Sequence, residues 1–75
     1  MTHALTLSLR RSEGALVRTL GTLERRGFEV TALVVTSTAT HLSLSLQVAG
    51  PRDPAVLTRQ LQRLVDVLDV RLAAP

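Results

Sequence analysis

The spacing of hydrophobic residues alternates between two periods, and this feature constrains the fold more than any other. In residues 5–10 and again in residues 42–48, Leu or Val alternates with polar residues, which is typical of a strand with one buried face. Each segment is followed by a loop and then by leucines spaced i, i+4, i+7, which is typical of a helix with one buried stripe. Both halves of the chain therefore predict a strand, a loop and a helix that packs on strands.

The first helix is predicted over residues 13–26 because both of its ends carry recognisable signals. Ser12 can cap its N-terminus through its hydroxyl oxygen, and Glu13 places negative charge at the positive end of the helix dipole. Gly27 suits a left-handed position after the helix, and Phe28 can fold back as the apolar contact that follows. The predicted buried stripe comprises Leu16, Val17, Leu20 and Leu23. The residues predicted to lie off this stripe are Arg18, Thr22, Arg25 and Arg26.

Two glycines of this first helix suggest close approach by another group. Gly14 leaves backbone amides open, so either a small anion or carboxylate binds there or the glycine allows the helix to pack closely on the sheet. Gly21 lies in the helix interior, where glycine costs about 1 kcal/mol relative to alanine. We therefore expect either a neighbouring strand or a second subunit to approach Gly21.

The rest of the chain predicts a strand hairpin, a second helix and a final strand. Residues 28–36 are rich in β-branched residues and are followed by a short polar connection to the second alternating segment. Asp53 and Pro54 are typical of a helix N-cap followed by proline, and this helix is expected to end near Val65. Residues 66–72 predict the last strand. Its two faces are expected to carry Leu68, Val70 and Leu72 on one side and Val67, Asp69 and Arg71 on the other.

The order of these elements is βαββαβ over a single domain, residues 1–75. Right-handed βαβ connections place both helices on one face of a four-stranded antiparallel sheet, so we expect an α+β, ferredoxin-like sandwich. The leucines of the alternating strands would then meet the leucines of both helices. The other face can stay wet because it carries small polar residues: Thr6, Ser8, Ser43, Ser45 and Gln47.

Composition argues against several classes of function. All nine basic residues are arginine, six acids lie among them and the net charge is +3, a modest field that does not indicate nucleic-acid binding. The single aromatic residue, Phe28, offers no platform for stacked bases. The absence of cysteine fits a cytoplasmic location, and no apolar run is long enough to cross a membrane. A domain this small buries only about 60% of its unfolded surface, so it gains much from a partner.

No catalytic residue, cofactor site or metal site is predicted. His3 lies near the N-terminus and His41 follows a turn, so both are expected to be solvated. Neither histidine has acidic residues beside it at metal-ligand spacing. Asp66 and Asp69 flank the start of the last strand, where we expect a solvated pair.

Three short motifs at matching distances resemble one family. Residues 13–16 (EGAL), 26–28 (RGF) and 64–67 (LVDV) resemble an ACT domain, and more narrowly the regulatory small subunit of acetolactate synthase. Residues 48–54 (VAGPRDP) are similar to its short, isozyme II type. The resemblance implies a non-catalytic subunit that binds the thiamine-diphosphate-dependent large subunit in branched-chain amino-acid synthesis. It also implies a homodimer joined at the sheet edges and an effector amino acid, Val, Leu or Ile, bound where the first loops meet that seam.

The same resemblance suggests residues for binding. The implied effector-binding residues are Arg11, Ser12, Glu13, Gly14, Ala15, Leu16, Glu29 and Val30. Effector-sensitive members carry Asn where this chain has Arg11 and Glu29, so an Arg11–Glu29 salt bridge that closes the pocket is an equal hypothesis. The candidate contacts with the large subunit are arginines on the outer helix faces: Arg18, Arg25, Arg59 and Arg63. Two alternatives stay open: a stand-alone ACT domain that senses an amino acid as a homodimer and regulates another enzyme, and a nucleic-acid-binding module.

Overall fold

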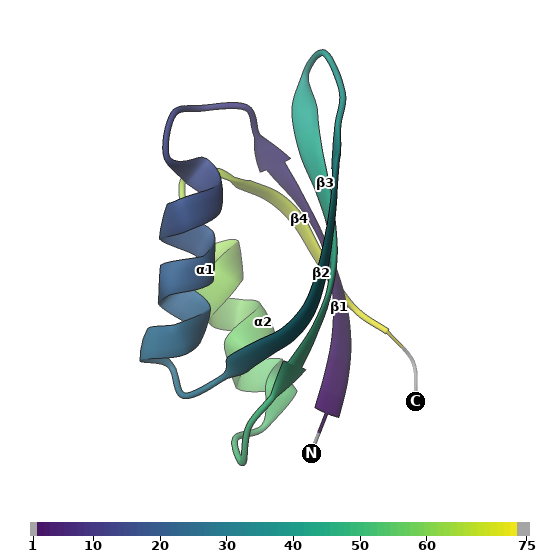
Figure 1. The fold of residues 1–75 in the computed structure, drawn as a ribbon. Coiled ribbons are helices and arrows are strands. Elements are labelled where there is room, and N and C mark those ends of the chain that lie inside the picture. Colours follow the sequence, from purple (N-terminus) through teal and green to yellow (C-terminus); the bar gives the residue numbers. More distant parts are fainter. Residues whose placement is uncertain (1, 74–75) are drawn as a thin grey trace.

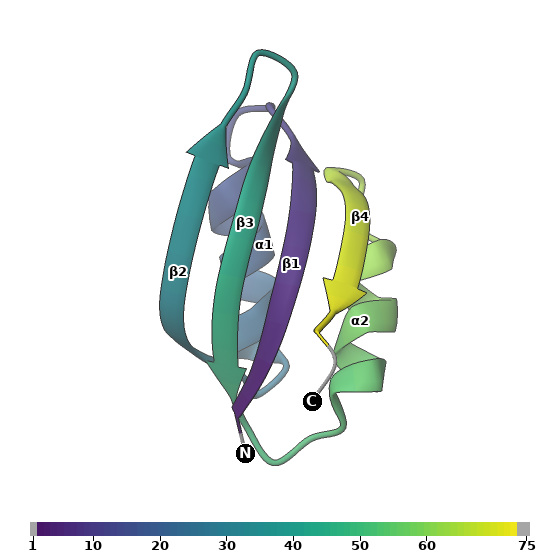
Figure 2. The same ribbon diagram turned by 90° about the vertical axis from the view of Figure 1, so that its right-hand side faces the viewer.

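The computed structural model describes residues 2–73, and Figure 1 shows both helices on one side of a twisted sheet. The elements along the chain are β1 (Thr2–Arg10), α1 (Ala15–Arg25), β2 (Glu29–Ser37), β3 (His41–Ala49), α2 (Pro54–Gln62) and β4 (Val67–Leu72). The strands form one antiparallel sheet in the order β2-β3-β1-β4 (Figure 2). The predicted ferredoxin-like βαββαβ sandwich is confirmed. Within residues 2–73, no helix is both long enough and apolar enough to cross a membrane.

The core lies between the sheet and the two helices. β1 and β3 pair along their whole length, from Thr2 opposite Ala49 to Arg10 opposite His41. This register puts the leucines of both strands on the face that the helices cover, as their alternation predicts. The core cluster comprises Leu5, Leu7, Leu9, Leu23, Phe28, Leu44, Leu46, Val48, Leu57, Leu61 and Val70.

The N-terminus of α1 differs from the prediction. The helix begins at Ala15, its N-cap is Gly14 in the left-handed conformation (φ 77°), and no side chain caps it. The prediction of Ser12 as N-cap is therefore wrong. The Ser12 hydroxyl instead donates a hydrogen bond to Asp66, 54 residues further along the chain. Glu13 precedes the first helical turn, which contains no acidic residue.

The other predicted helix ends are largely confirmed. After α1, the amide of Gly27 donates to the Glu24 carbonyl and the amide of Phe28 donates to the Leu23 carbonyl. This is the Schellman arrangement, with Gly27 at φ 89° and Phe28 buried. Asp53 caps α2 by accepting a 2.9 Å hydrogen bond from the Ala55 amide, with proline in the first turn. The helix ends at Gln62, before the predicted Val65.

α1 is rotated relative to the predicted stripe. Thr19 and Thr22 are buried, whereas the Val17 side chain is 74% exposed. Each threonine hydroxyl donates to the carbonyl four residues earlier, to Ala15 at 2.9 Å and to Arg18 at 3.0 Å. Because these hydroxyls are satisfied by the helix itself, both threonines can face the core with little penalty. The predictions of Val17 as a core residue and of Thr22 as an outer residue are wrong.

Gly21 lacks the neighbouring strand that we expected. A Cβ atom at Gly21 would meet only the Arg25 guanidinium, with Nη1 at 3.2 Å. The prediction that a strand approaches this glycine closely is therefore wrong. Approach by a second subunit is the alternative that stays open.

A β-bulge alters the faces of β4. The register with β1 shifts between Ser8, which lies opposite Asp69, and Leu9, which lies opposite Val67. The shift turns Val67 toward the core, where it is partly buried, and leaves Leu68 51% exposed. The predicted strict alternation of faces along β4 is wrong at these two residues.

Candidate effector loop, sheet edge and helix groove

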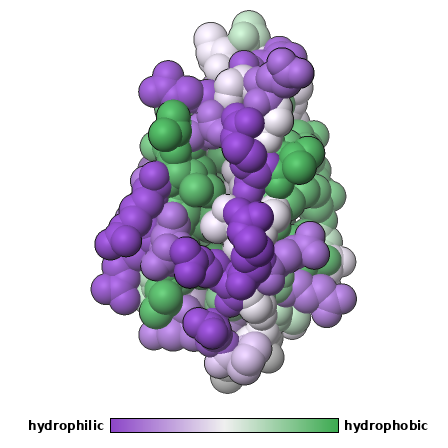
Figure 3. Space-filling view, turned by 90° about the vertical axis from the view of Figure 1, so that its left-hand side faces the viewer, coloured by the Kyte–Doolittle hydropathy of each residue, from purple (hydrophilic) through white to green (hydrophobic). Residues whose placement is uncertain are grey.

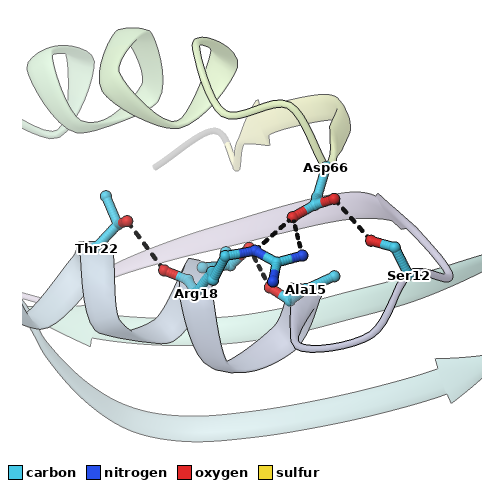
Figure 4. Close-up of polar contacts among 6 residues, drawn as sticks. Ser12, Ala15, Arg18, Thr22 and Asp66 are labelled. Atoms are coloured by element: carbon cyan, nitrogen blue, oxygen red, sulfur yellow. Dashed lines mark hydrogen bonds and ion pairs between the residues drawn. The ribbon is translucent and has the colours of Figure 1, made fainter.

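The loop between β1 and α1 is fastened to the turn between α2 and β4 through Asp66 (Figure 4). The Asp66 carboxylate accepts hydrogen bonds from Ser12 Oγ at 2.7 Å and from Arg18 Nε and Nη2 at 2.9 and 2.7 Å. The Asp66 carbonyl also accepts from the Arg10 amide at 2.7 Å. We call Ser12, Arg18 and Asp66 the loop clamp. It joins segments that are about 50 residues apart in the sequence.

The electrostatics of the loop clamp favour a charged carboxylate. The hydrogen bond from Ser12 and then those from Arg18 lower the pKa of Asp66 below its ordinary value of 3.8. The Asp66 side chain is 14% exposed, so the prediction of a solvated pair is wrong for this residue. The prediction of a solvated side chain fits Asp69 better, because this side chain is 54% exposed. It pairs with Arg71 at 3.0 Å.

The loop clamp also covers Gly14. A Cβ atom on Gly14 would lie 2.8 Å from Arg18 Nη1, and its φ of 77° already disfavours any other residue. The guanidinium therefore lies against the loop backbone, where an anionic ligand was predicted to approach. An internal carboxylate, that of Asp66, already accepts hydrogen bonds from the Ser12 hydroxyl and the Arg18 guanidinium beside this glycine.

The hypothesis of an Arg11–Glu29 salt bridge within one chain is wrong. Arg11 follows β1 at one end of the sheet, and its Nη1 donates to the Thr38 carbonyl in the β2–β3 turn at 2.8 Å. Glu29 begins β2 at the other end, opposite Ala49, which in turn lies opposite Thr2. With about 3.4 Å per strand residue, the two ends are about 27 Å apart, too far for any contact between these side chains.

β2 is an exposed edge strand with apolar side chains. Val34 is 64% exposed, Leu33 37% and Val35 39%, and every residue from Thr31 to Ser37 is exposed. The residues Leu16 and Leu20 of α1 are only partly buried. By the helix period they lie on the side of α1 opposite Thr22 and Arg25, which line the groove with α2, and therefore on the side toward β2. Figure 3 shows hydrophobic atoms along the right-hand edge of the helical face, the side on which β2 lies. An apolar edge of this length favours pairing with another strand.

The four arginines predicted to contact a partner lie in different surroundings. Arg18 is held in the loop clamp, and Arg59 is exposed on α2. Arg25 and Arg63 come together at a groove of about 470 Å³ between the two helices, and Arg26 joins them there. Sequence reasoning missed Arg26 as a member of this group, because nothing in the sequence shows how α1 and α2 are placed side by side.

The two histidines are far apart. His3 pairs with Val48 near one end of the sheet, and His41 pairs with Arg10 at the other end. The His41 ring contacts the hydroxyls of Thr38 and Thr40, both at 3.1 Å from Nδ1. Within residues 2–73, no group of three or more His, Asp or Glu side chains is arranged to hold a metal ion.

Comparison with known proteins agrees with the fold and the sequence motifs. A family model for the ACT domain matches residues 11–70. The chain is 35% identical over 74 residues to the acetolactate synthase isozyme 2 small subunits of Escherichia coli K12 and Shigella flexneri. These matches cover 96% of this chain and 85% of each relative.

Two solved structures share the fold at low sequence identity. The acetolactate synthase small subunit of Thermotoga maritima has a TM-score of 0.86 and 22% identity, and the match covers all of this chain and 48% of that one. The ACT domain from the GTP pyrophosphokinase of Chlorobium tepidum has a TM-score of 0.82 and 11% identity, with 97% of both chains covered. The family model and the 35% identity show that this chain belongs to the ACT-domain family of regulatory, non-catalytic modules, among the acetolactate synthase small subunits.

Proposed function

We propose that the chain is the regulatory or activating small subunit of an acetolactate synthase in branched-chain amino-acid synthesis. It acts by binding the thiamine-diphosphate-dependent large subunit and carries out no chemistry of its own. The observation that supports this role is the 35% identity to isozyme 2 small subunits across 96% of the chain. The small apolar core and the exposed β2 edge also suit a chain that gains burial from partners.

Co-purification with the large subunit of the same organism tests this function. We expect stoichiometric recovery of the large subunit with the tagged chain, and a higher acetolactate synthase activity in the mixture than in the large subunit alone. Recovery of the chain without the large subunit, together with thermal stabilisation by an amino acid, would instead indicate a stand-alone sensor.

The exposed β2 edge supports a homodimer. A two-fold axis beside Leu33, the middle residue of β2, would pair the two copies antiparallel and bury Leu33 and Val35 of each. The partly buried Leu16 and Leu20 of α1 lie beside this edge and would gain cover from the second copy. The unpaired amides and carbonyls of the edge would also gain partners.

The charges at the two ends of β2 match in such a dimer. Antiparallel pairing sets Glu29 of one copy opposite Ser37 of the other. Arg11 lies close to Ser37, because its guanidinium donates to the Thr38 carbonyl. Arg11 can therefore pair with the partner subunit's Glu29, although the two residues are too far apart within one chain. Symmetry gives two such ion pairs per dimer.

This arrangement argues against a tightly bound effector. The residues proposed for the site are those of the first loop, from Arg11 to Leu16, with Glu29 and Val30 of the partner subunit. Asp66 already accepts hydrogen bonds from Ser12 and Arg18, and in the proposed dimer Arg11 pairs with the partner subunit's Glu29. We expect no heat of binding from Val, Leu or Ile at millimolar concentration in a calorimetric titration. A dissociation constant in the low-millimolar range or tighter would contradict the closed loop.

A further inference from the structure

The groove between α1 and α2 gathers positive charge. It has a volume of about 470 Å³ and is lined by Thr22, Arg25, Arg26, Gln60, Arg63 and Leu64. Three of these six residues carry a permanent positive charge and none is acidic. The groove lies on the helical face of the molecule, where Figure 3 shows hydrophilic side chains interspersed with hydrophobic patches.

The arginines of this groove have no internal counter-ions. The ion pairs within residues 2–73 are Arg18–Asp66 and Arg71–Asp69, so neither involves the groove. The C-terminal ends of the two helices attract arginines, because the C-terminus of a helix carries partial negative charge. That attraction amounts to about half a charge per helix end, which leaves most of the positive charge of three guanidinium groups unbalanced.

Hydrogen bonds fix one guanidinium at the groove. Arg25 Nη2 donates to Thr22 Oγ1 at 3.2 Å, and the Thr22 hydroxyl donates to the Arg18 carbonyl at 3.0 Å. The chain of two bonds holds Arg25 against α1 and leaves its other N–H donors free. A guanidinium held in this way loses less entropy when it binds a carboxylate in the two-pronged geometry that arginine favours.

The shape and lining suit an acidic protein segment. The arginines come from two helices and line an open groove, so a small acid would touch only some of them and stay largely in water. A segment with two or more carboxylates can reach both helices, and the partly buried Leu64 offers apolar contact between them. We infer that this groove docks an acidic segment of the acetolactate synthase large subunit. The inference rests on the proposed function and names the surface through which the chain binds the large subunit.

The groove is compatible with the proposed homodimer. Pairing at β2 uses the edge of the sheet and the Leu16–Leu20 side of α1, whereas the groove lies on the opposite side of α1. Both copies of a dimer would therefore present a groove on the same helical face. Of the four arginines predicted to contact the large subunit, Arg25 and Arg63 take this role and Arg26 is added, whereas Arg18 serves the loop clamp and Arg59 lies outside the groove and is not given this role.

A binding titration against the purified large subunit of the same organism tests the inference. The test variant is Arg25→Gln/Arg63→Gln, and the control is Arg52→Gln/Arg59→Gln, which removes the same charge from two exposed positions outside the groove. We expect the test variant to bind about tenfold more weakly or worse at about 0.1 M salt, whereas the control stays within about twofold. High salt should shrink the difference between wild type and test variant. Thermal unfolding of both variants checks that the fold is retained.

Three other outcomes would overturn the inference, and they separate it from the proposed function. If both double variants lose affinity equally, general charge attracts the large subunit and the groove has no special role. If the test variant binds normally while inorganic phosphate stabilises the wild type but not the test variant, the groove is a small-anion site. If even the wild-type chain fails to bind the large subunit, the proposed function falls together with the inference.

Discussion

Reversing the charges of Arg11 and Glu29, which lie near the two ends of β2, should weaken the dimer. Combining both reversals should restore dimer affinity only if the two residues pair across the proposed β2 seam. The variants are Arg11→Glu, Glu29→Arg and the combination of both. An exposed ion pair contributes about 0.2–1 kcal/mol. The two symmetric pairs of the dimer therefore contribute about 0.4–2 kcal/mol, which is about a 2- to 30-fold change in the dimer dissociation constant. Each single reversal should weaken the dimer by at least this factor, since repulsion replaces attraction.

The combined variant distinguishes a direct pair from a general effect of charge. Within one chain Arg11 and Glu29 lie at opposite ends of the sheet, so exchanging them can restore pairing only between two copies. Sedimentation equilibrium at about 50 mM and about 500 mM salt should show weak dimers for the single variants, near-wild-type affinity for the double variant, and smaller differences at high salt. Additive losses in the double variant would refute the antiparallel β2 seam. Arg71→Glu, on β4 at the other edge, is the matched control.

Three further predictions concern stability. Gly50→Ala should destabilise the fold by about 1–3 kcal/mol in urea unfolding, because the new Cβ would lie 2.7 Å from the Gly27 carbonyl oxygen. Gly21→Ala should cost less, because its Cβ would meet only the Arg25 side chain, at 3.2 Å, and alanine has the higher helix propensity; the opposite ranking would contradict the packing described. Leu61→Ala should cost about 2–5 kcal/mol, a large part of the roughly 4–11 kcal/mol expected for a domain of this size, so a loss below 1 kcal/mol would place Leu61 outside the core. Asp66→Asn should be less stable than wild type at neutral pH, and the difference should shrink as the pH falls through the lowered pKa of Asp66, below 3.8; a difference that is constant down to pH 3 would exclude a charged clamp.

The fold follows from local patterns that the sequence displays openly. The alternating leucines of β1 and β3 set which face of the sheet is buried, because a one-residue slip would expose all of them. Asp53 caps α2 and Gly27 closes α1, since each signal acts within a few residues of the chain. Such short-range chemistry explains why the element order and the sheet with both helices on one face could be predicted.

The parts that the sequence did not reveal depend on distant contacts. Asp66 reads as a solvated residue until the α2–β4 turn is placed beside Ser12 and Arg18. Likewise, Thr22 reads as an outer residue because its hydroxyl is polar, although the hydrogen bond to the Arg18 carbonyl lets it face the core. The groove at Arg25 and Arg63 also exists only after the helices are packed side by side.

The proposal that this chain works by docking depends above all on its binding to the large subunit. Isothermal titration of the wild-type chain into the purified acetolactate synthase large subunit measures that binding without relying on activity. We predict saturable binding with an affinity that weakens as the salt concentration rises, because the arginine groove takes part. Absence of binding at concentrations where both proteins are folded would show that the chain regulates something else.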